Sequence, residues 1–299
     1  MRNAFVYSIK NFTDNNNIKT LDILGAFTVI EYLRDLSVMP SDAQLAYFCN
    51  EMNVRKRQVV CDVSKSNITT QAGAMQWMSG MVETKSNVKG VGDFLGKMAG
   101  SMVTKESGVK PMYYGTGKMM LEPTYKHIIL LNVAEWGSIV LDDGLFLACE
   151  GSLNQQVVAR TNISSAVFGG EGLFNLALSG NGIVALESYV PREELIEVIL
   201  ENDVMKIDGN MAIAWSGSLN FTVEKSGKSL VGSMASGEGL VNVYRGTGKI
   251  LMAPTAANYT ANPAASDSDT GESQSKATST VEAAGKAIGA LSDVLDIFS

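Results

Sequence analysis

Few residues of this sequence have the types and spacing that catalysis requires. The single histidine, His127, opens the apolar segment YKHIILLNV, and one histidine cannot build a histidine metal cluster. Asp142 and Asp143 are adjacent, and adjacent strand residues point to opposite faces, so this pair indicates a turn. Hydrolases and transferases need a base, a nucleophile and a group that stabilises developing charge. We therefore expect no catalytic residues, no metal site and no enzyme activity.

The glycine-rich stretches do not have the features of phosphate-binding loops. The run GGEGLF at Gly169 to Phe174 lacks the Lys-Ser/Thr of a P-loop. It also opens an apolar strand, whereas a dinucleotide-binding fingerprint opens a helix. Three Gly-x-Gly motifs, at 115–117, 180–182 and 246–248, are expected to supply positive φ angles at hairpin tips. No cofactor is therefore expected.

Three glutamates recur at similar places before these motifs and are candidate partner-binding residues. Glu106, Glu171 and Glu238 each lie eight or nine residues before the glycine turn. They would therefore occupy equivalent sites around a pseudo-threefold axis. The competing interpretation is that each carboxylate accepts backbone N–H groups at a tight turn.

Arg55, Lys56 and Arg57 form the one dense basic run and are a second group of candidate partner-binding residues. Such a run is usually a solvated strand end or loop. It could instead anchor an acidic partner, including the acidic tail of this chain. The formal net charge of −7 argues against a general nucleic-acid binder, which needs surplus Lys and Arg to displace counterions.

The Gly-x-Gly motifs define a repeat. Gly115, Gly180 and Gly246 are spaced by 65 and 66 residues, and the segments between them read as short alternating strands. We expect an all-β fold of β-sandwich or double-stranded β-helix type, built from three pseudo-equivalent repeats at about 57–124, 125–189 and 190–255. Trp77 and Trp215 fall at nearly matching positions and are expected to pack in the core.

The regions outside the repeats have a different composition. Residues 1–52 are expected to form an extension packed on the β-domain (53–255), with strands at Ile18 to Leu24 and Phe27 to Leu33 around Gly25. A helix over Lys19 to Leu36 is the alternative. A short helix from Ala43 to Cys49 would be capped by Ser41-Asp42.

The C-terminal region divides into a linker and a helix. Residues 256–281 are rich in Ala, Ser, Thr, Asn and Asp and are expected to be a disordered tether. Residues 282–299 carry apolar residues at helical spacing, which predicts an amphipathic helix with a docking face. That face comprises Ile288, Leu291, Leu295 and Phe298.

Cysteine content and hydropathy indicate where the protein resides. Cys49, Cys61 and Cys149 form neither a disulfide framework nor a CxxC pair, so reduced thiols are expected. The N-terminus lacks a secretory h-region, and no apolar run reaches the ~18–20 residues of a membrane span. We expect a cytoplasmic protein, with a peripheral membrane association through the C-terminal helix left open.

Three motifs together resemble a known family. GAMQWMSG (Gly73 to Gly80), the Gly-Gly-Glu-Gly-Leu-Phe run and SGEGLVNVYRGTGKILMAPT (Ser236 to Thr255) resemble the family of the yeast "altered inheritance of mitochondria" protein twenty-four. That family is similar in fold to the tryptophan RNA-binding attenuation protein. The resemblance implies a repeated β fold that oligomerises, and a link to inner-membrane organisation in mitochondrial members. Copy one departs from the pattern, with Lys-Glu-Ser-Gly at Lys105 to Gly108.

These observations favour a non-enzymatic scaffold or binding protein. We expect a homo-oligomer, a trimer or larger, linked to membrane-associated complexes, with a further protein partner captured by the C-terminal helix. The alternative is an RNA-binding protein, by analogy with the attenuation-protein fold alone. Nucleic acid is the less expected partner because of the net charge.

Overall fold

The computed structural model of the chain describes residues 7–12, 14–85, 110–159, 174–209, 211–225 and 240–255, all of which belong to one compact unit, Met1–Ala256. Several residues singled out in the sequence lie outside this described part. They are Glu106, Glu171 and Glu238, the tether at 256–281 and the C-terminal face formed by Ile288, Leu291, Leu295 and Phe298. The predictions made for these residues remain predictions.

The N-terminal extension begins with the expected hairpin. Strands β1 (Ile18–Leu24) and β2 (Phe27–Tyr32) pair antiparallel around Gly25, whose φ of 57° is costly for a residue with a side chain. The alternative helix over this stretch is therefore wrong. A 3₁₀ turn, η1 (Pro40–Asp42), and helix α1 (Ala43–Glu51) follow. Asp42 is the residue before α1, but its side chain makes no capping hydrogen bond, so the predicted cap is wrong.

The remaining strands belong to the three segments recognised in the sequence. The first segment contains β3 (Arg57–Asp62), β4 (Ile68–Thr70), β5 (Met75–Lys85) and β6 (Met112–Leu121). The second contains β7 (His127–Asn132), η3 (Val133–Trp136), β8 (Ser138–Leu141), β9 (Phe146–Glu150), β10 (Asn154–Ala159), β11 (Phe174–Ser179) and β12 (Ile183–Ser188). The third contains η4 (Arg192–Glu194), β13 (Ile196–Asp208), β14 (Ala212–Ser216), β15 (Asn220–Lys225) and β16 (Leu240–Met252).

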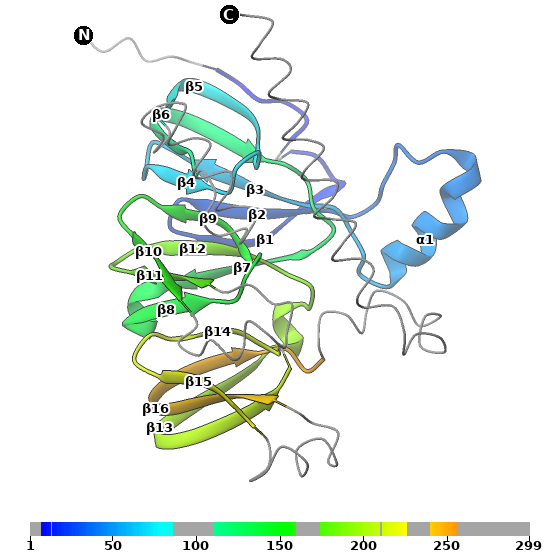
Figure 1. Cartoon of the computed structure of the whole chain (residues 1–299). Helices are drawn as coiled ribbons and strands as arrows, with labels where there is room; N and C mark the ends of the chain where they lie inside the picture. The colour runs from blue at the N-terminus through cyan, green and yellow to red at the C-terminus, as the bar shows by residue number, and fades with distance from the viewer. Residues whose placement is uncertain are drawn as a thin grey trace, which may run out of the picture. The chain divides into compact units, whose positions relative to one another are not determined.

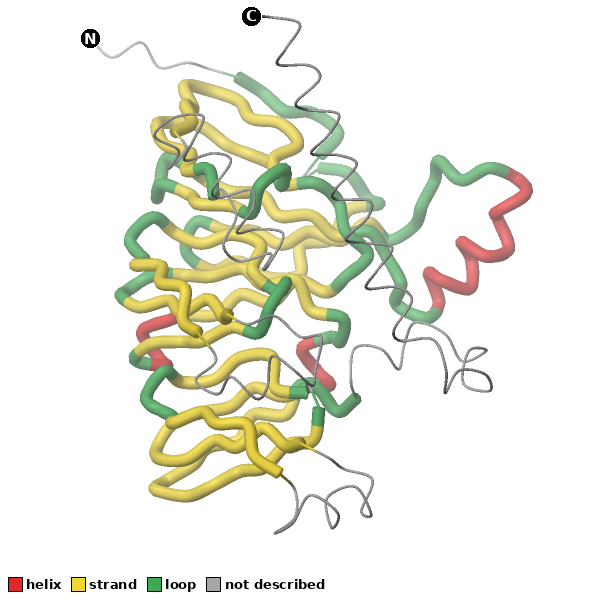
Figure 2. Tube along the Cα trace, in the orientation of Figure 1, coloured by secondary structure: helices red, strands yellow, loops and turns green. Residues whose placement is uncertain are grey.

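These strands form two antiparallel sheets, so the predicted all-β class is confirmed (Figures 1 and 2). In the described part of the chain, the first sheet has the order β1-β2-β3-β6-β4-β9-β12-β7, with β5 also paired to β6. The second has the order β10-β11-β8-β14-β16-β13, with β15 also paired to β16. The largest core cluster draws on both sheets, because it contains Ile129 and Phe146 from the first and Ile139 and Ile213 from the second.

A β-bulge falls at a matching place in each segment. The pairing shifts register between Met75 and Trp77, between Ala185 and Leu186, and between Ala212 and Ala214. The extra residues are Gln76, Leu147 and Ile213. A bulge bends its strand and increases the local twist, so the three segments bend at the same point.

The bulges fix which residues correspond between the segments. Met78, Cys149 and Trp215 each face the residue two places after a Gly-x-Gly motif. Trp215 therefore corresponds to Met78, and Trp77 lies one position away from the residue that matches Trp215. Since neighbouring strand residues point to opposite faces, the two tryptophans are not equivalent, although Trp215 does pack in the core as expected.

The Gly-x-Gly motifs are not hairpin tips, so that prediction is wrong. Gly115 lies within β6 and Gly246 within β16, while Gly180 directly follows β11, before the chain continues into β12 of the other sheet. All three have φ between 112° and 121°. Each motif therefore lies where the chain changes its hydrogen-bonding partners from one set of strands to another. A positive φ angle permits such a change as readily as it permits a turn.

Close backbone approach at Gly115 gives a test of this role. A Cβ atom there would collide with the carbonyl oxygen of Met81 on β5, so Gly115→Ala is expected to destabilise the protein by about 2–4 kcal/mol. Gly73→Ala is the control, because its φ is also positive but open space surrounds it, and it should cost about 1–2 kcal/mol. Urea unfolding measures both, and equal losses would contradict the crossing-strand explanation.

Candidate functional site

The basic run lies where the extension rejoins the first sheet, and acidic residues neutralise it. Arg55 and Arg57 both contact Glu31 of β2, and Lys56 contacts Asp35 in the loop after β2. We call the segment between β2 and β3 the arm (residues 33–56). The basic run at its C-terminal end is thus bonded to carboxylates at its N-terminal end. Its role as an anchor for an external acidic partner is not supported by these contacts.

Arg57 and Glu31 form a buried ion pair at the base of the arm. Arg57 Nη2 lies 2.7 Å from Glu31 Oε2, and the two side chains are 2% and 5% exposed. The guanidinium also donates to the backbone oxygen of Asn53 at 2.9 Å and to its side-chain oxygen at 2.8 Å. Its other terminal nitrogen, Nη1, donates to the carbonyl oxygens of Arg55 at 3.3 Å and Tyr125 at 3.4 Å. Such a satisfied network fixes geometry more than it adds stability.

Lys56 and Asp35 form a second, more exposed pair. Lys56 Nζ lies 3.0 Å from Asp35 Oδ2, and the hydroxyl of Tyr125 donates to the same oxygen at 3.4 Å. The hydrogen bond from Lys56 is the main reason that the pKa of Asp35 lies below its usual value of 3.8. Tyr125 follows β6, so this contact links the arm to the end of the first segment.

The arm carries the largest group of exposed apolar side chains in the extension. Helix α1 has no buried residue, and Figures 1 and 2 show it standing away from both sheets. The seven exposed apolar residues of the arm are Leu36, Met39, Leu45, Tyr47, Phe48, Met52 and Val54. Five of them expose more than 60% of their surface: Leu36, Met39, Leu45, Tyr47 and Met52. A contiguous apolar surface on a monomer is typical of an interaction site.

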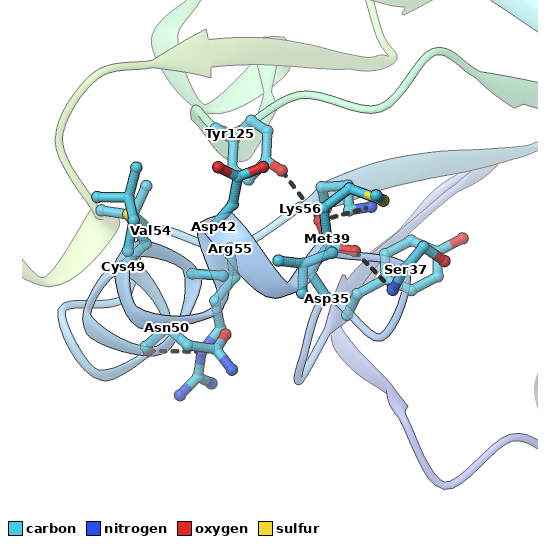
Figure 3. Close-up of a pocket in the computed structure, with 14 residues that line it drawn as sticks. Asp35, Ser37, Met39, Asp42, Cys49, Asn50, Val54, Arg55, Lys56 and Tyr125 are labelled. Carbon is cyan, nitrogen blue, oxygen red and sulfur yellow. Dashed lines mark hydrogen bonds and ion pairs between the residues drawn. The ribbon is translucent and has the colours of Figure 1, made fainter.

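A cavity of about 490 Å³ opens between α1, the loop before it and Tyr125 (Figure 3). Met39, Leu45 and Val54 give it apolar walls, while Asp35 and Lys56 supply charged groups at the side nearer β2. Its size suits one or two apolar side chains or a small molecule. The sequence analysis did not identify this cavity, because its lining comes from residues spread between Tyr32 and Tyr125.

The single histidine and two of the three cysteines lie in the core or at its edge. His127 is the first residue of β7, and burial, followed by the charge of Arg57, lowers its pKa. Cys61 is buried, which raises the pKa of its thiol, and burial raises the pKa of Cys149 to about 12. Both thiols are therefore protonated and poorly nucleophilic at neutral pH. The described residues contain no group of three or more His, Cys, Asp or Glu side chains that could hold a metal ion.

Among the described residues, no helix combines the length and hydropathy needed to cross a bilayer.

Comparison with known proteins gives consistent matches. The family model "Mitochondrial biogenesis AIM24" matches residues 52–255. An uncharacterised protein of Streptococcus pyogenes serotype M6 is 33% identical over 194 residues, which is 62% of this chain and 76% of that protein. A crystal structure of a Streptococcus pyogenes protein superposes with a TM-score of 0.52 at 26% identity, covering 70% of this chain and 92% of that one.

The buried pair gives a double-mutant test. Arg57→Met leaves Glu31 buried beside the weaker Arg55 contact and should cost about 3–5 kcal/mol. Adding Glu31→Leu removes the stranded carboxylate, so the double variant should regain most of that loss. Urea unfolding of the two variants measures the difference. A double variant less stable than Arg57→Met would contradict this explanation.

The exposed pair gives a pH test. Because the folded-state pKa of Asp35 is lowered, the stability from Lys56 is complete above pH about 3.8 and is lost as the pH falls through the lower folded value. Lys56→Met should therefore cost about 0.2–1 kcal/mol at pH 7 and less near pH 3. Lys118→Met, an exposed change on β6, is the control and should show no such pH dependence in urea midpoints.

Proposed function

We propose that this chain, which belongs to the mitochondrial biogenesis AIM24 family by the match over residues 52–255, is a non-enzymatic binding protein. It would hold a protein partner on its arm. The observation that carries the proposal is the exposure of the seven apolar side chains of the arm. The partner is expected to offer an apolar surface with at least one side chain that fits the cavity beside α1.

The energetics of α1 support this role. A helix of nine residues is marginal in water by itself, and α1 gains little from burial because none of its residues is buried. A partner that covered Leu45 and Phe48 would gain about 1.5–3 kcal/mol from each side chain. The helix is nevertheless held in place at its base, since Arg55 donates to the carbonyl of Asn50 at 3.1 Å.

The buried pair at the base prepares the arm for binding. Arg57 holds the backbone oxygens of Asn53 and Arg55, which fixes the direction in which the chain leaves α1. A surface that is ordered before it meets its partner loses less conformational entropy on binding. The charged groups of Asp35 and Lys56 would then add specificity at the rim of the contact.

The alternative of RNA binding receives no support from the basic run. Arg55, Lys56 and Arg57 all face carboxylates, and the surplus positive charge that phosphate contacts require is therefore absent at this place. We favour a protein partner for the arm.

A comparison of two double variants tests the proposal. Leu45→Ser with Phe48→Ser removes apolar surface from α1, whereas Val157→Ser with Ile199→Ser removes similar exposed residues from β10 and β13. Tagged full-length proteins would be cross-linked in native cells and recovered with their partners. We expect at least a tenfold loss of cross-linked partner for the arm variant only.

Two results would overturn the proposal. Equal recovery by both variants, each with an unchanged melting temperature, would show that the arm does not bind the partner. Turnover of a metabolite by the purified protein, abolished by Lys56→Met in the cavity, would show an enzyme instead.

A further inference from the structure

Successive segments of the chain are joined by one kind of strand pair, used twice. Strand β4 of the first segment pairs antiparallel with β9 of the second, and β8 of the second pairs antiparallel with β14 of the third. The first junction places Ile68 opposite Glu150, Thr69 opposite Cys149 and Thr70 opposite Ala148. The second places Ile139 opposite Ser216, Val140 opposite Trp215 and Leu141 opposite Ala214.

The two junctions have the same register. Ile68 and Ile139 each also face the residue two places before a Gly-x-Gly motif, Tyr113 and Leu178 respectively. On the other side of each junction, Cys149 and Trp215 face the residues two places after such a motif. The central cross-strand pairs Thr69–Cys149 and Val140–Trp215 are therefore equivalent.

The same correspondence identifies two strand edges with no partner in the described part of the chain. Met205 of β13 faces Tyr244, two places before Gly246, so Met205–Ile207 corresponds to the joining strands β4 and β8. Met78 of β5 faces Met119, two places after Gly117, so Trp77–Ser79 corresponds to β9 and β14. In the described chain β13 pairs only with β16, and β5 pairs only with β6.

Exposure distinguishes these edges from the internal junctions. Met78 is 42% exposed, whereas its counterparts Cys149 and Trp215 are 0% and 3% exposed. Lys206 is exposed, whereas its counterparts Thr69 and Val140 are buried. On its open side, each edge therefore presents backbone N–H and C=O groups that have no strand partner in the described part of the chain. The equivalent groups of the counterpart strands pair with a neighbouring strand, so each edge is a template for another strand.

We propose that copies of this chain associate head to tail, with Met205–Ile207 of one copy pairing antiparallel with Trp77–Ser79 of the next. The register places Met205 opposite Ser79, Lys206 opposite Met78 and Ile207 opposite Trp77. A second copy is the fitting partner because it supplies the strand type with which the counterparts of each edge pair at the internal junctions. The Lys206 stem can cover Met78 while its ammonium group stays in water.

This interface is heterologous, because the two edges belong to different strands. β5 lies toward one end of the described strands and β13 toward the other (Figure 1). Each added copy leaves one edge of each kind free, so such an interface builds either a closed ring or an open filament. The interface does not involve the arm and is independent of the function proposed above.

A charge exchange tests the interface. Met78→Lys would place a lysine opposite Lys206 of the next copy, and like charges directly opposite each other disfavour pairing. We expect self-association of the full chain, measured by sedimentation velocity over a concentration series, to weaken roughly fivefold or more. Lys206→Glu added to Met78→Lys should restore it. Met81→Lys, an equally exposed change on β5 beyond the three paired residues, is the control and should have little effect.

Three results would overturn the proposal: a wild-type chain that stays monomeric across the series, equal effects of Met78→Lys and Met81→Lys, or no restoration in the charge-exchanged double variant. The arm variant Leu45→Ser with Phe48→Ser separates this proposal from the one above. It should self-associate like the wild type even where it has lost its cross-linked partner.

Discussion

The register of the two internal junctions is the constraint on which the rest of the fold depends. Side chains alternate between faces along a strand, and β9 and β14 are almost wholly buried, so a slip of one residue would move every packed side chain of these strands to the opposite face. The bulge residues Leu147 and Ile213 lie next to these pairs and keep the register on both sides. The same bulge occurs at Gln76 in the first segment, where β5 pairs only with β6 in the described part of the chain.

The N-terminal extension is attached to this framework by two carboxylates. Glu150, at the end of β9, accepts hydrogen bonds from the backbone N–H groups of Ala26 at 2.8 Å and Ile183 at 2.9 Å, which ties the β1–β2 hairpin to the second segment. Glu31 ties β2 to the start of β3 through Arg57. The hairpin is part of the first sheet because β2 pairs antiparallel with β3, and the arm leaves the sheet between these two strands.

Local patterns in the sequence were sufficient for the fold class and for several elements. The β-branched run around Gly25 predicted the first hairpin, His127 was placed at a strand start, and Asp142-Asp143 at a turn, all as observed. The Gly-x-Gly motifs misled, because a positive φ serves a turn and a crossing strand equally well, and only the pairing partners separate the two.

The candidate site was harder to predict because its contacts are distant in sequence. Arg57 has its carboxylate partner 26 positions earlier, in Glu31, so the basic run looked unpaired when read alone. The exposure of Leu45 and Phe48 also has no local signal, since an apolar residue in a short helix normally faces a core. The signal available was the position of this helix outside the repeats, where no sheet face needed covering.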